Sequence, residues 1–393
     1  MLFQTFDEKK DCFMIYKNSQ FFKEITDDCR KTWAYAPYLK KRDIEYANLF
    51  AAGQTLEEAC PEIWKEELEE IQARLKAVLK SAVATGVNLK DICLYDLMPT
   101  HMLEKWASIK NNICNHIFDN CERPENYNDI LNLEKMITEI KSQPLKIDTS
   151  VIKSITVQDR NIIKTLQECD KVISYDQFKT VTGRLSTKKN SFPVMTLAKK
   201  YRKVLKPTND WLFEIDFNAC ELRVALGLLG HEQPEGDLHE WNLKNVFLRS
   251  KDRDNAKKRI FAWLYNPKST EAKVGDIYDR EKIKSLYFSD NKVKTIFNRE
   301  IECDEAHAVN YVIQSTAADL VFEQMYKVWE LLEGRKSFIK FCNHDSLVID
   351  FSEDDQYILN DIKRAFDVTR LGKFRVNCSA GKDWHDMKKL NIN

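Results

Sequence analysis

Two aspartates at the ends of predicted strands are the residues best placed to do chemistry. Asp216 closes the apolar run 211–217, and Asp345 stands in a polar tip between the apolar runs 337–341 and 347–351. Short carboxylates that project from strands into a shared cleft suit Mg²⁺, which prefers oxygen ligands and keeps several waters. Two such ions about 4 Å apart promote phosphoryl and nucleotidyl transfer. An Asp at a strand end is more often a turn former, so this interpretation needs further residues.

Those residues come from a stripe along one predicted helix, over 253–265. Its four members recur at intervals of four and are Arg253, Lys257, Phe261 and Tyr265. Ser250 or Asp252 is the candidate cap, and Asn266 followed by Pro267 ends the helix. The cations occupy the N-terminal end, where the helix dipole favours anions, and the stripe spans roughly 18 Å. A triphosphate at the cationic end with its sugar and base at the aromatic end fits this pattern. An exposed cationic face beside two core aromatics fits it equally well.

Charge is balanced over the whole chain but unevenly distributed. Lys plus Arg and Asp plus Glu each number 61, whereas 179–206 holds nine Lys or Arg and no acid, and 57–70 holds seven Glu. Zero net charge argues against a nucleic-acid partner, because phosphate contacts need cations. The basic stretch has aromatic and apolar residues interleaved, so it predicts either a groove that follows a phosphate backbone or a solvated face. The acidic stretch is best interpreted as a solvated face.

Periodicity predicts a mostly helical first half and an alternating second half. Apolar residues at three- and four-residue steps predict one amphipathic helix from Pro61 to about Ala84. The run 211–217 predicts a strand, and 337–351 predicts a β-hairpin with a polar tip. A long helix is expected from about Asp304 to Leu332, ended by Gly334. These elements together indicate an α+β protein.

Seven segments, taken in order, resemble the motifs of family A (bacterial Pol I type) DNA polymerases. They are TGRLS (182–186), IDFNACELR (215–223), DLH (237–239), RDNAKKRIFAWLY (253–265), NYVIQSTAAD (310–319), NHDS (343–346) and FRVNCSAGKDW (374–384). The similarity runs from about Tyr175 to the end of the chain. Because many motifs occur in one order, the resemblance is specific.

The resemblance assigns a role to each matching position. Asp216 and Asp345 would bind two Mg²⁺ ions, for which Mn²⁺ can substitute, with the Phe217 carbonyl as a further ligand. Glu221 would be a steric gate that crowds a ribose 2′-hydroxyl. The nucleotide-binding group would be His239, Arg253, Lys257, Phe261 and Tyr265, with Lys257 also donating a proton to the pyrophosphate leaving group. The DNA-binding group would be Arg184, Arg202, Asn310, Gln314 and His344, in part through the minor groove.

This sequence departs from the family pattern at several positions. Ser346 stands where the family usually has a third carboxylate, after His344 and Asp345. Asn218, Ala219 and Cys220 replace the customary residues before Glu221. The stretch after TGRLS lacks the usual template-contacting motif. We therefore expect an active site built on two carboxylates rather than three.

The resemblance implies an α+β, right-hand polymerase fold with an antiparallel palm sheet and helical fingers and thumb. The expected division is an N-terminal segment of unknown role (1–45), a helical thumb (46–165), a first palm segment (166–236), fingers (237–300) and a second palm segment (301–393). No strand bearing a DxE pair precedes Tyr175, so no proofreading exonuclease is expected. A chain of this kind is typical of phage or other mobile elements.

The expected partners are primer-template DNA and deoxynucleoside triphosphates, with exonuclease, helicase or processivity functions on separate proteins. No apolar window long enough to cross a membrane and no signal peptide is evident, so we expect a cytoplasmic protein, in the host bacterium if phage-encoded. Eleven single cysteines without a CxxC pair fit reduced thiols.

Two alternatives remain open. A single-subunit RNA polymerase-like enzyme has the same right-hand palm architecture. Glu221 argues against it, because a ribonucleotide-using enzyme needs space at this position. An inactive DNA-binding accessory protein would explain the missing third carboxylate, but both aspartates and the whole stripe of the 253–265 helix are present.

Overall fold

The computed structural model describes residues 1–7, 14–89, 91–154, 159–247 and 252–392, which form two compact units, Met1–Thr138 and Glu139–Asn393. The helices of the first unit are α1 (Ala47–Phe50), α2 (Glu62–Ala84), α3 (Leu94–Leu97) and α4 (Thr100–Asn120), and the division falls within α5 (Tyr127–Ser142). Its strands are β1 (Gln4–Thr5), β2 (Ile15–Lys17) and β3 (Gln20–Phe22) in one antiparallel sheet, with β4 (Lys31–Thr32) parallel to β5 (Glu45–Tyr46).

The first unit is held together by α2 packed against α4. Leu68 and Ile71 of α2 are buried, and Trp64, Leu75 and Val78 pack against the same core. These are the side chains whose spacing predicted a helix over 61–84, and that prediction is confirmed. Because each short strand near the N-terminus spans only two or three residues, its periodicity is too brief to be recognised in the sequence.

The second unit contains a five-stranded antiparallel sheet in the order β14-β15-β10-β18-β19. Its members are β10 (Trp211–Phe217), β14 (Phe338–Asn343), β15 (Ser346–Phe351), β18 (Val376–Gly381) and β19 (Lys388–Leu390). The smaller pairings join β6 (Lys146–Ile147) to β9 (Leu205–Lys206), β7 (Tyr175–Asp176) to β8 (Ser186–Thr187), β16 (Val368–Thr369) to β17 (Gly372–Lys373), and β11 (Phe288–Ser289), β12 (Lys292–Lys294) and β13 (Glu300–Glu302) to one another.

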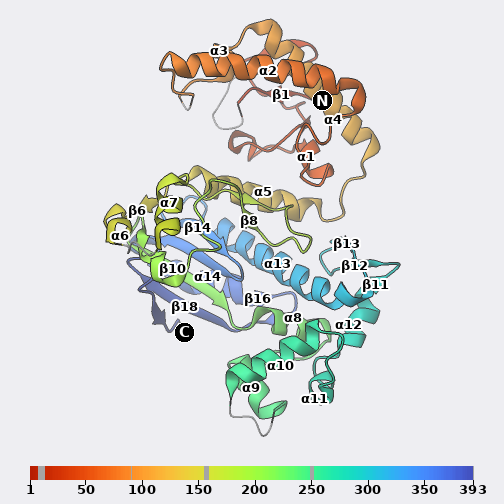
Figure 1. Cartoon of the computed structure of the whole chain (residues 1–393), viewed down its shortest axis with the longest axis vertical. Coiled ribbons are helices and arrows are strands. Elements are labelled where there is room, and N and C mark those ends of the chain that lie inside the picture. Colours follow the sequence, from red (N-terminus) through yellow and green to blue (C-terminus); the bar gives the residue numbers. More distant parts are fainter. Residues whose placement is uncertain (8–13, 90, 155–158, 248–251, 393) are drawn as a thin grey trace. The chain divides into compact units, whose positions relative to one another are not determined.

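Helices cover this sheet and extend beyond one end of β10. They are α6 (Thr149–Ser154), α7 (Arg160–Glu168), α8 (Cys220–Leu228), α9 (Leu238–Asn245), α10 (Arg253–Tyr265), α11 (Ala272–Gly275), α12 (Arg280–Tyr287), α13 (Glu305–Leu332) and α14 (Leu359–Asp367). Helices α13 and α14 pack against each other, and α14 also packs on β10 and β18. Figure 1 shows α9, α10 and α11 grouped together near α8, which follows directly from β10.

The central strand β10 has one apolar face and one mixed face. Phe213, Ile215 and Phe217 are at most 2% exposed, while Glu214 and Asp216 on the opposite face are partly exposed. Successive side chains of a strand point to opposite faces, so the alternation fixes the direction of Asp216. The strand predicted over 211–217 is confirmed.

The predicted hairpin is also present, and it contains a buried ion pair. Lys340 of β14 lies 3.1 Å from Asp350 of β15, and both side chains are fully buried. Asp350 also accepts hydrogen bonds from the N–H groups of Thr208 and Asn209, each at 2.7 Å. The register of β14 shifts between Ile339 and Phe341, around Lys340. Burial of two charges is tolerated here because each has further polar partners.

The two long helices predicted for the second half are confirmed. The Asp252 side chain caps α10 by accepting hydrogen bonds from two backbone N–H groups, while Ser250, the other candidate, lies outside the described residues. Asp304 caps α13, and Gly334 follows its end at φ +76°. The finer division into thumb, palm and fingers stays a prediction.

The structure also bears on the expectations about the cysteines and about membrane-spanning helices. Among the described residues nine cysteines are free, as expected for reduced thiols, whereas Cys93 is disulfide-bonded and departs from that expectation. Within the described part of the chain, no helix combines the length and the apolar character needed to cross a membrane.

Candidate active site

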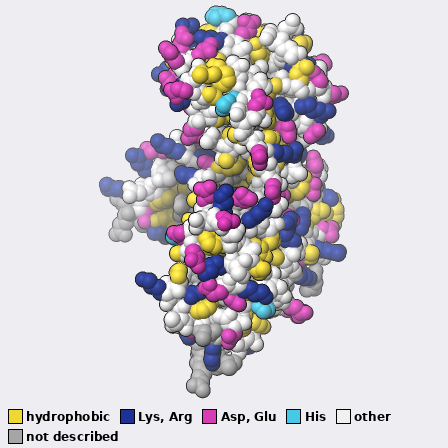
Figure 2. All heavy atoms as spheres, turned by 90° about the vertical axis from the view of Figure 1, so that its right-hand side faces the viewer, with side chains coloured by type: hydrophobic (Ala, Val, Ile, Leu, Met, Phe, Trp, Pro, Cys, Tyr) yellow, Lys and Arg dark blue, Asp and Glu magenta, His cyan; other side chains and the backbone are white. Residues whose placement is uncertain are grey.

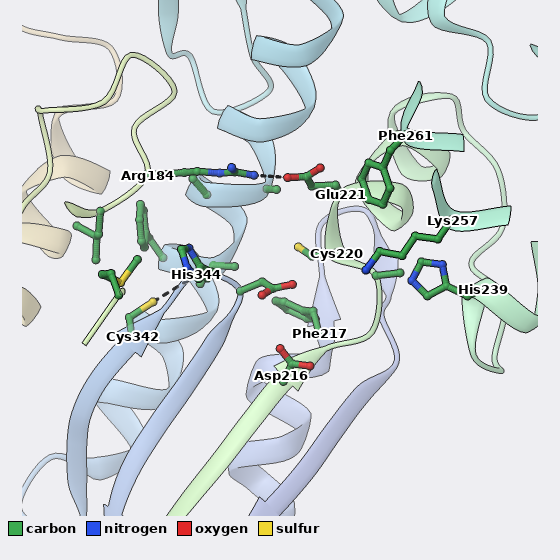
Figure 3. A pocket seen from close by; sticks show the side chains of 18 residues that line it. Arg184, Asp216, Phe217, Cys220, Glu221, His239, Lys257, Phe261, Cys342 and His344 are labelled. Carbon is green, nitrogen blue, oxygen red and sulfur yellow. Dashed lines mark hydrogen bonds and ion pairs between the residues drawn. The ribbon is translucent and has the colours of Figure 1, made fainter. Parts of the chain in front are cut away.

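A cavity of about 620 Å³ lies where the end of β10, the β14–β15 turn and four helices meet. Asp216 and Phe217 come from β10, Asp345 from the turn, and Lys257 from α10. Figure 3 shows Asp216 and Phe217 on one side, Lys257 and His239 on another, and Arg184 facing Glu221. The structure therefore brings residues from opposite ends of the predicted motif series into one site.

The two aspartates reach this cavity because their strands are neighbours. Asp216 is paired across the sheet with Ser346, the residue that follows Asp345. The Phe217 N–H donates a hydrogen bond to the Asp345 carbonyl oxygen at 3.3 Å. Both carboxylates therefore extend from a rigid, hydrogen-bonded part of the sheet, as the sequence predicted.

Burial and neighbouring negative charges disfavour the ionised form of both aspartates. Burial raises the pKa of Asp216 to about 7, and the nearby charges of Asp345 and Glu214 add to the effect against one hydrogen bond from Asn377. Burial also raises the pKa of Asp345. Both shifts disfavour the ionised carboxylates, which a divalent cation bound to them would stabilise.

The donor set fits hard cations that keep part of their water. No group of three or more His, Cys, Asp or Glu side chains placed to hold a metal is found in the described ranges. Two carboxylates are nevertheless the usual protein contribution to Mg²⁺ sites, where substrate phosphates and waters complete the shell. Phe217 also lines the cavity, and its ring stacks on that of Phe366 with the ring centres 4.4 Å apart.

The wall opposite the aspartates carries basic and aromatic side chains. Lys257, His239 and Phe261 all line the cavity, and Lys257 Nζ lies 5.9 Å from the Phe261 ring centre. His239 is 6% exposed, and among the described residues its Nδ1 has no hydrogen-bond partner. Burial, followed by the charges of Arg253 and Lys257, lowers the pKa of His239. A polyanion bound here would supply both the missing partner and the missing negative charge.

Arg253, predicted to belong to the same wall, is held at its edge. Its Nη2 lies 3.1 Å from Asp237 Oδ2, and it does not line the cavity. Asp237 caps α9 by accepting hydrogen bonds from the N–H groups of His239 and Glu240. Although burial opposes it, hydrogen bonds from the Glu240 N–H, Asn218 and Arg253 lower the pKa of Asp237 to about 2. Asp237 thus joins α9 to the start of α10.

Glu221, the predicted steric gate, is engaged through both of its carboxylate oxygens. Arg184 donates to Oε1 and Tyr265 Oη donates to Oε2. Glu221 and Arg184 line the cavity, whereas Tyr265, at the end of α10, does not. The sequence predicted all three as functional residues but not that they form one network.

Asn310 and Gln314 lie on the face of α13 that leads to the cavity. Ala317, Ala318 and Val321 line the cavity, one to two turns further along the same helix. Residues three and four apart share a face, so Asn310 and Gln314 continue this stripe beyond the cavity. The side-chain oxygen of Asn310 is buried and without a hydrogen-bond partner in the described part of the chain.

His344 and Arg202 lie near the aspartates on the sheet side. His344 is exposed at φ +56° in the β14–β15 turn and lines the cavity. The Arg202 guanidinium stacks on Trp384 at 4.0 Å and borders a second cavity of about 300 Å³ that also contains Asp216 and Asp345. Glu214 borders this second cavity too. It was missed in the sequence, although its place two residues before Asp216 puts both on one face of a strand.

The basic stretch 179–206 is partly neutralised by acids from elsewhere. Arg184 pairs with Glu221, Lys200 with Asp159, and Lys206 with Asp383. Figure 2 shows cationic and anionic side chains interspersed over the face that it presents. This distribution agrees with a net charge of zero and does not form a large single-sign patch on that face.

Comparison with known proteins identifies the fold. No protein-family model and no curated protein sequence matches the chain. Among solved structures, it is similar to the polymerase domain of Pol1 from M. smegmatis in complex with DNA primer-template and dNTP, with a TM-score of 0.64 and 14% sequence identity. The match covers 88% of this chain and 82% of that one. The chain therefore has the α+β, right-hand fold of that polymerase domain, as the sequence predicted.

Proposed function

We propose that the chain is a template-directed DNA polymerase that adds deoxynucleotides to a primer 3′ end. The observation that carries the proposal is the cavity in which Asp216 and Asp345 face Lys257 and His239. One wall is anionic and suits metal ions, and the other is cationic and suits phosphates. The polymerase domain with a similar fold was solved with primer-template and dNTP, which supports the same substrates here.

The proposal assigns metal binding to the two aspartates and triphosphate binding to the basic side chains. Two Mg²⁺ ions held by Asp216, Asp345 and the Phe217 carbonyl would lower the pKa of the primer hydroxyl and offset the charge of the pyrophosphate. Lys257 protonates the leaving pyrophosphate, and His239, whose buried Nδ1 has no hydrogen-bond partner among the described residues, donates to a phosphate oxygen. Further contacts to the triphosphate come from Arg253.

The remaining predicted residues position the sugar, base and DNA. Phe261 and Tyr265 border the nascent base pair, and Glu221 limits space at the ribose 2′ carbon. The residues proposed to contact primer-template are Arg184, Arg202, Asn310, Gln314 and His344. Closure of α10 over a correctly paired nucleotide would bring Lys257 and Arg253 onto the triphosphate, which makes selection depend on fit.

The proposal is tested by primer extension with purified protein, Mg²⁺ and each sugar type. We expect template-dependent incorporation of deoxynucleotides and weak incorporation of ribonucleotides. Equal use of both sugars would favour the RNA polymerase-like alternative. Absence of extension with Mg²⁺ and with Mn²⁺, together with retained binding of primer-template, would favour the inactive accessory protein.

Selectivity between the sugars should depend on Glu221. In Glu221→Ala the carboxylate that fills the space is lost, so discrimination against ribonucleotides should fall about tenfold or more. Tyr265→Phe is the matched control, because it keeps the ring and Glu221 but removes the hydrogen bond from Tyr265 Oη, and its effect should be smaller. The measurement is the ratio of kcat/KM for the two sugars, and an unchanged ratio in Glu221→Ala would reject the gate assignment.

A further inference from the structure

The second cavity, of about 300 Å³, places a third carboxylate beside the two aspartates. Glu214, Asp216 and Asp345 all line it. Glu214 and Asp216 are two residues apart on β10 and therefore project from the same face of the sheet. Across the sheet, Glu214 is paired with Ser379 and Val348, so neither directly opposite position holds an acid.

Ser346 is a hydrogen-bonding neighbour of Glu214. Ser346 is 3% exposed, and its Oγ lies 3.3 Å from Glu214 Oε1 and 3.0 Å from the Asn343 carbonyl oxygen. The single hydroxyl proton can be donated to either oxygen. A carboxylate at position 346 would meet Glu214 with like charge, whereas a serine hydroxyl is a partner for it. The residue types at 214 and 346 are thus complementary.

The side chain of Asn343 lines the same cavity and has an unsatisfied hydrogen-bond acceptor. Asn343 is 9% exposed, and its Oδ1 has no hydrogen-bond partner among the residues that the structure describes. Buried amide oxygens are almost always satisfied by protein or ordered water. An orphaned amide oxygen beside three carboxylates therefore points to a ligand that donates hydrogen bonds or carries positive charge, such as a hydrated cation.

We propose that Glu214 supplies the third anionic group of the metal site, in place of a carboxylate at position 346. The proposal rests on the proposed two-metal function and adds a residue to it. Glu214 acts as a positioning residue that accepts hydrogen bonds from water bound to the cation, and the Asn343 oxygen accepts another. Ser346 supports this orientation when its hydroxyl donates to Glu214 rather than to the Asn343 carbonyl oxygen.

Glu214 is expected to contact the cation through a bound water rather than directly. The described residues include no set of three acidic, His or Cys side chains close enough to bind one metal directly. Mg²⁺ dehydrates reluctantly and keeps several waters, so a carboxylate one water away still orients its shell. Groups in this outer position commonly change metal affinity by about 10- to 100-fold when they are replaced.

The test is Mn²⁺ affinity, measured by electron paramagnetic resonance at about pH 8 without DNA or nucleotide. Glu214→Gln keeps the size and an oxygen that can accept the Ser346 hydrogen bond but removes the charge. We expect it to raise the Kd for Mn²⁺ about tenfold. Glu300→Gln, at an exposed position in β13, removes one charge elsewhere and should leave the Kd within about twofold.

A purely structural role for Glu214 predicts a different result. Because Glu214→Gln retains a hydrogen-bond acceptor for Ser346, such a role leaves Mn²⁺ affinity at the wild-type value, and that outcome overturns the inference. Absence of Mn²⁺ binding to the wild-type chain also overturns it. Primer extension by the wild-type chain is measured separately, so a chain that binds Mn²⁺ through Glu214 but extends no primer rejects the polymerase proposal alone.

Discussion

Replacing Asp216 with Asn is expected to slow primer extension at least about a thousandfold while stabilising the metal-free protein above neutral pH. The loss of rate follows from the proposed role, because a metal that stabilises the transition state contributes several kcal/mol. The gain in stability follows from burial of Asp216 next to Asp345 and Glu214, which raises its pKa to about 7. Function and stability therefore change in opposite directions at one residue.

The sign of the stability change depends on pH. Below pH 3.8, the ordinary pKa of Asp, the side chain is protonated in both the folded and the unfolded chain, and the substitution has little effect. As the pH rises, the unfolded chain ionises first, whereas the folded chain holds its proton until about pH 7. Folding is therefore opposed increasingly over this range, and the full penalty applies above pH 7. Asparagine cannot ionise and so removes this penalty. We expect the free energy of unfolding to rise by about 2 kcal/mol, after allowance for the partial exposure of the side chain.

Denaturant unfolding in EDTA at pH 5 and pH 8.5 measures this effect. The stabilisation of Asp216→Asn over wild type should be larger at pH 8.5, and Mg²⁺ should stabilise wild type but not the variant. Asp276→Asn, at an exposed turn position, is the control and should match wild type. Wild-type primer extension by Asp216→Asn would remove Asp216 from the mechanism.

The second large effect is expected at the buried ion pair of the hairpin. In Asp350→Ala, the charge of Lys340 stays buried without its partner, and the N–H groups of Thr208 and Asn209 lose their acceptor. Breaking one side of a buried pair typically costs about 3 to 5 kcal/mol. We expect a loss of about 4 kcal/mol in the free energy of unfolding of the second unit.

A matched control for this substitution lies close by in the sequence. Lys336 and Asp354 form an ion pair at 2.5 Å with side chains 69% and 66% exposed, so Asp354→Ala should cost less than about 1 kcal/mol. Urea unfolding of both variants gives the comparison. A cost below about 1 kcal/mol for Asp350→Ala would mean that water reaches Lys340 and replaces the lost carboxylate.

The sequence predicted those helices and strands whose ends are marked by adjacent residues, such as capping side chains, proline or a polar turn. Helix α10 begins and ends where Asp252 and the Asn266-Pro267 step predict, because capping and helix termination depend on adjacent residues. The hairpin that carries Asp345 was likewise recognisable from two apolar runs around a polar tip. The strands near the N-terminus were not, since each is stabilised by a partner strand rather than by its own pattern.

The contacts of the candidate site that the sequence did not reveal are those set by tertiary structure. The approach of Ser346 to Glu214 depends on the register between β10 and β15, which no spacing within either strand reveals. The pairing of Arg184 with Glu221 joins two residues of different motifs that are 37 positions apart. Residue types in motifs thus indicated which side chains gather, whereas sheet register and helix packing determined which of them touch.

Under the proposed function, the pairing of Arg184 with Glu221 would couple the binding of DNA to the binding of nucleotide. A primer-template that contacted Arg184 through its phosphates or bases would first have to separate it from Glu221, which among the described residues would keep its hydrogen bond from Tyr265. The free energy of that separation is part of the affinity for DNA and also sets the charge that an incoming sugar meets. By thermodynamic linkage, a nucleotide that favours the released Glu221 strengthens DNA binding by the same factor.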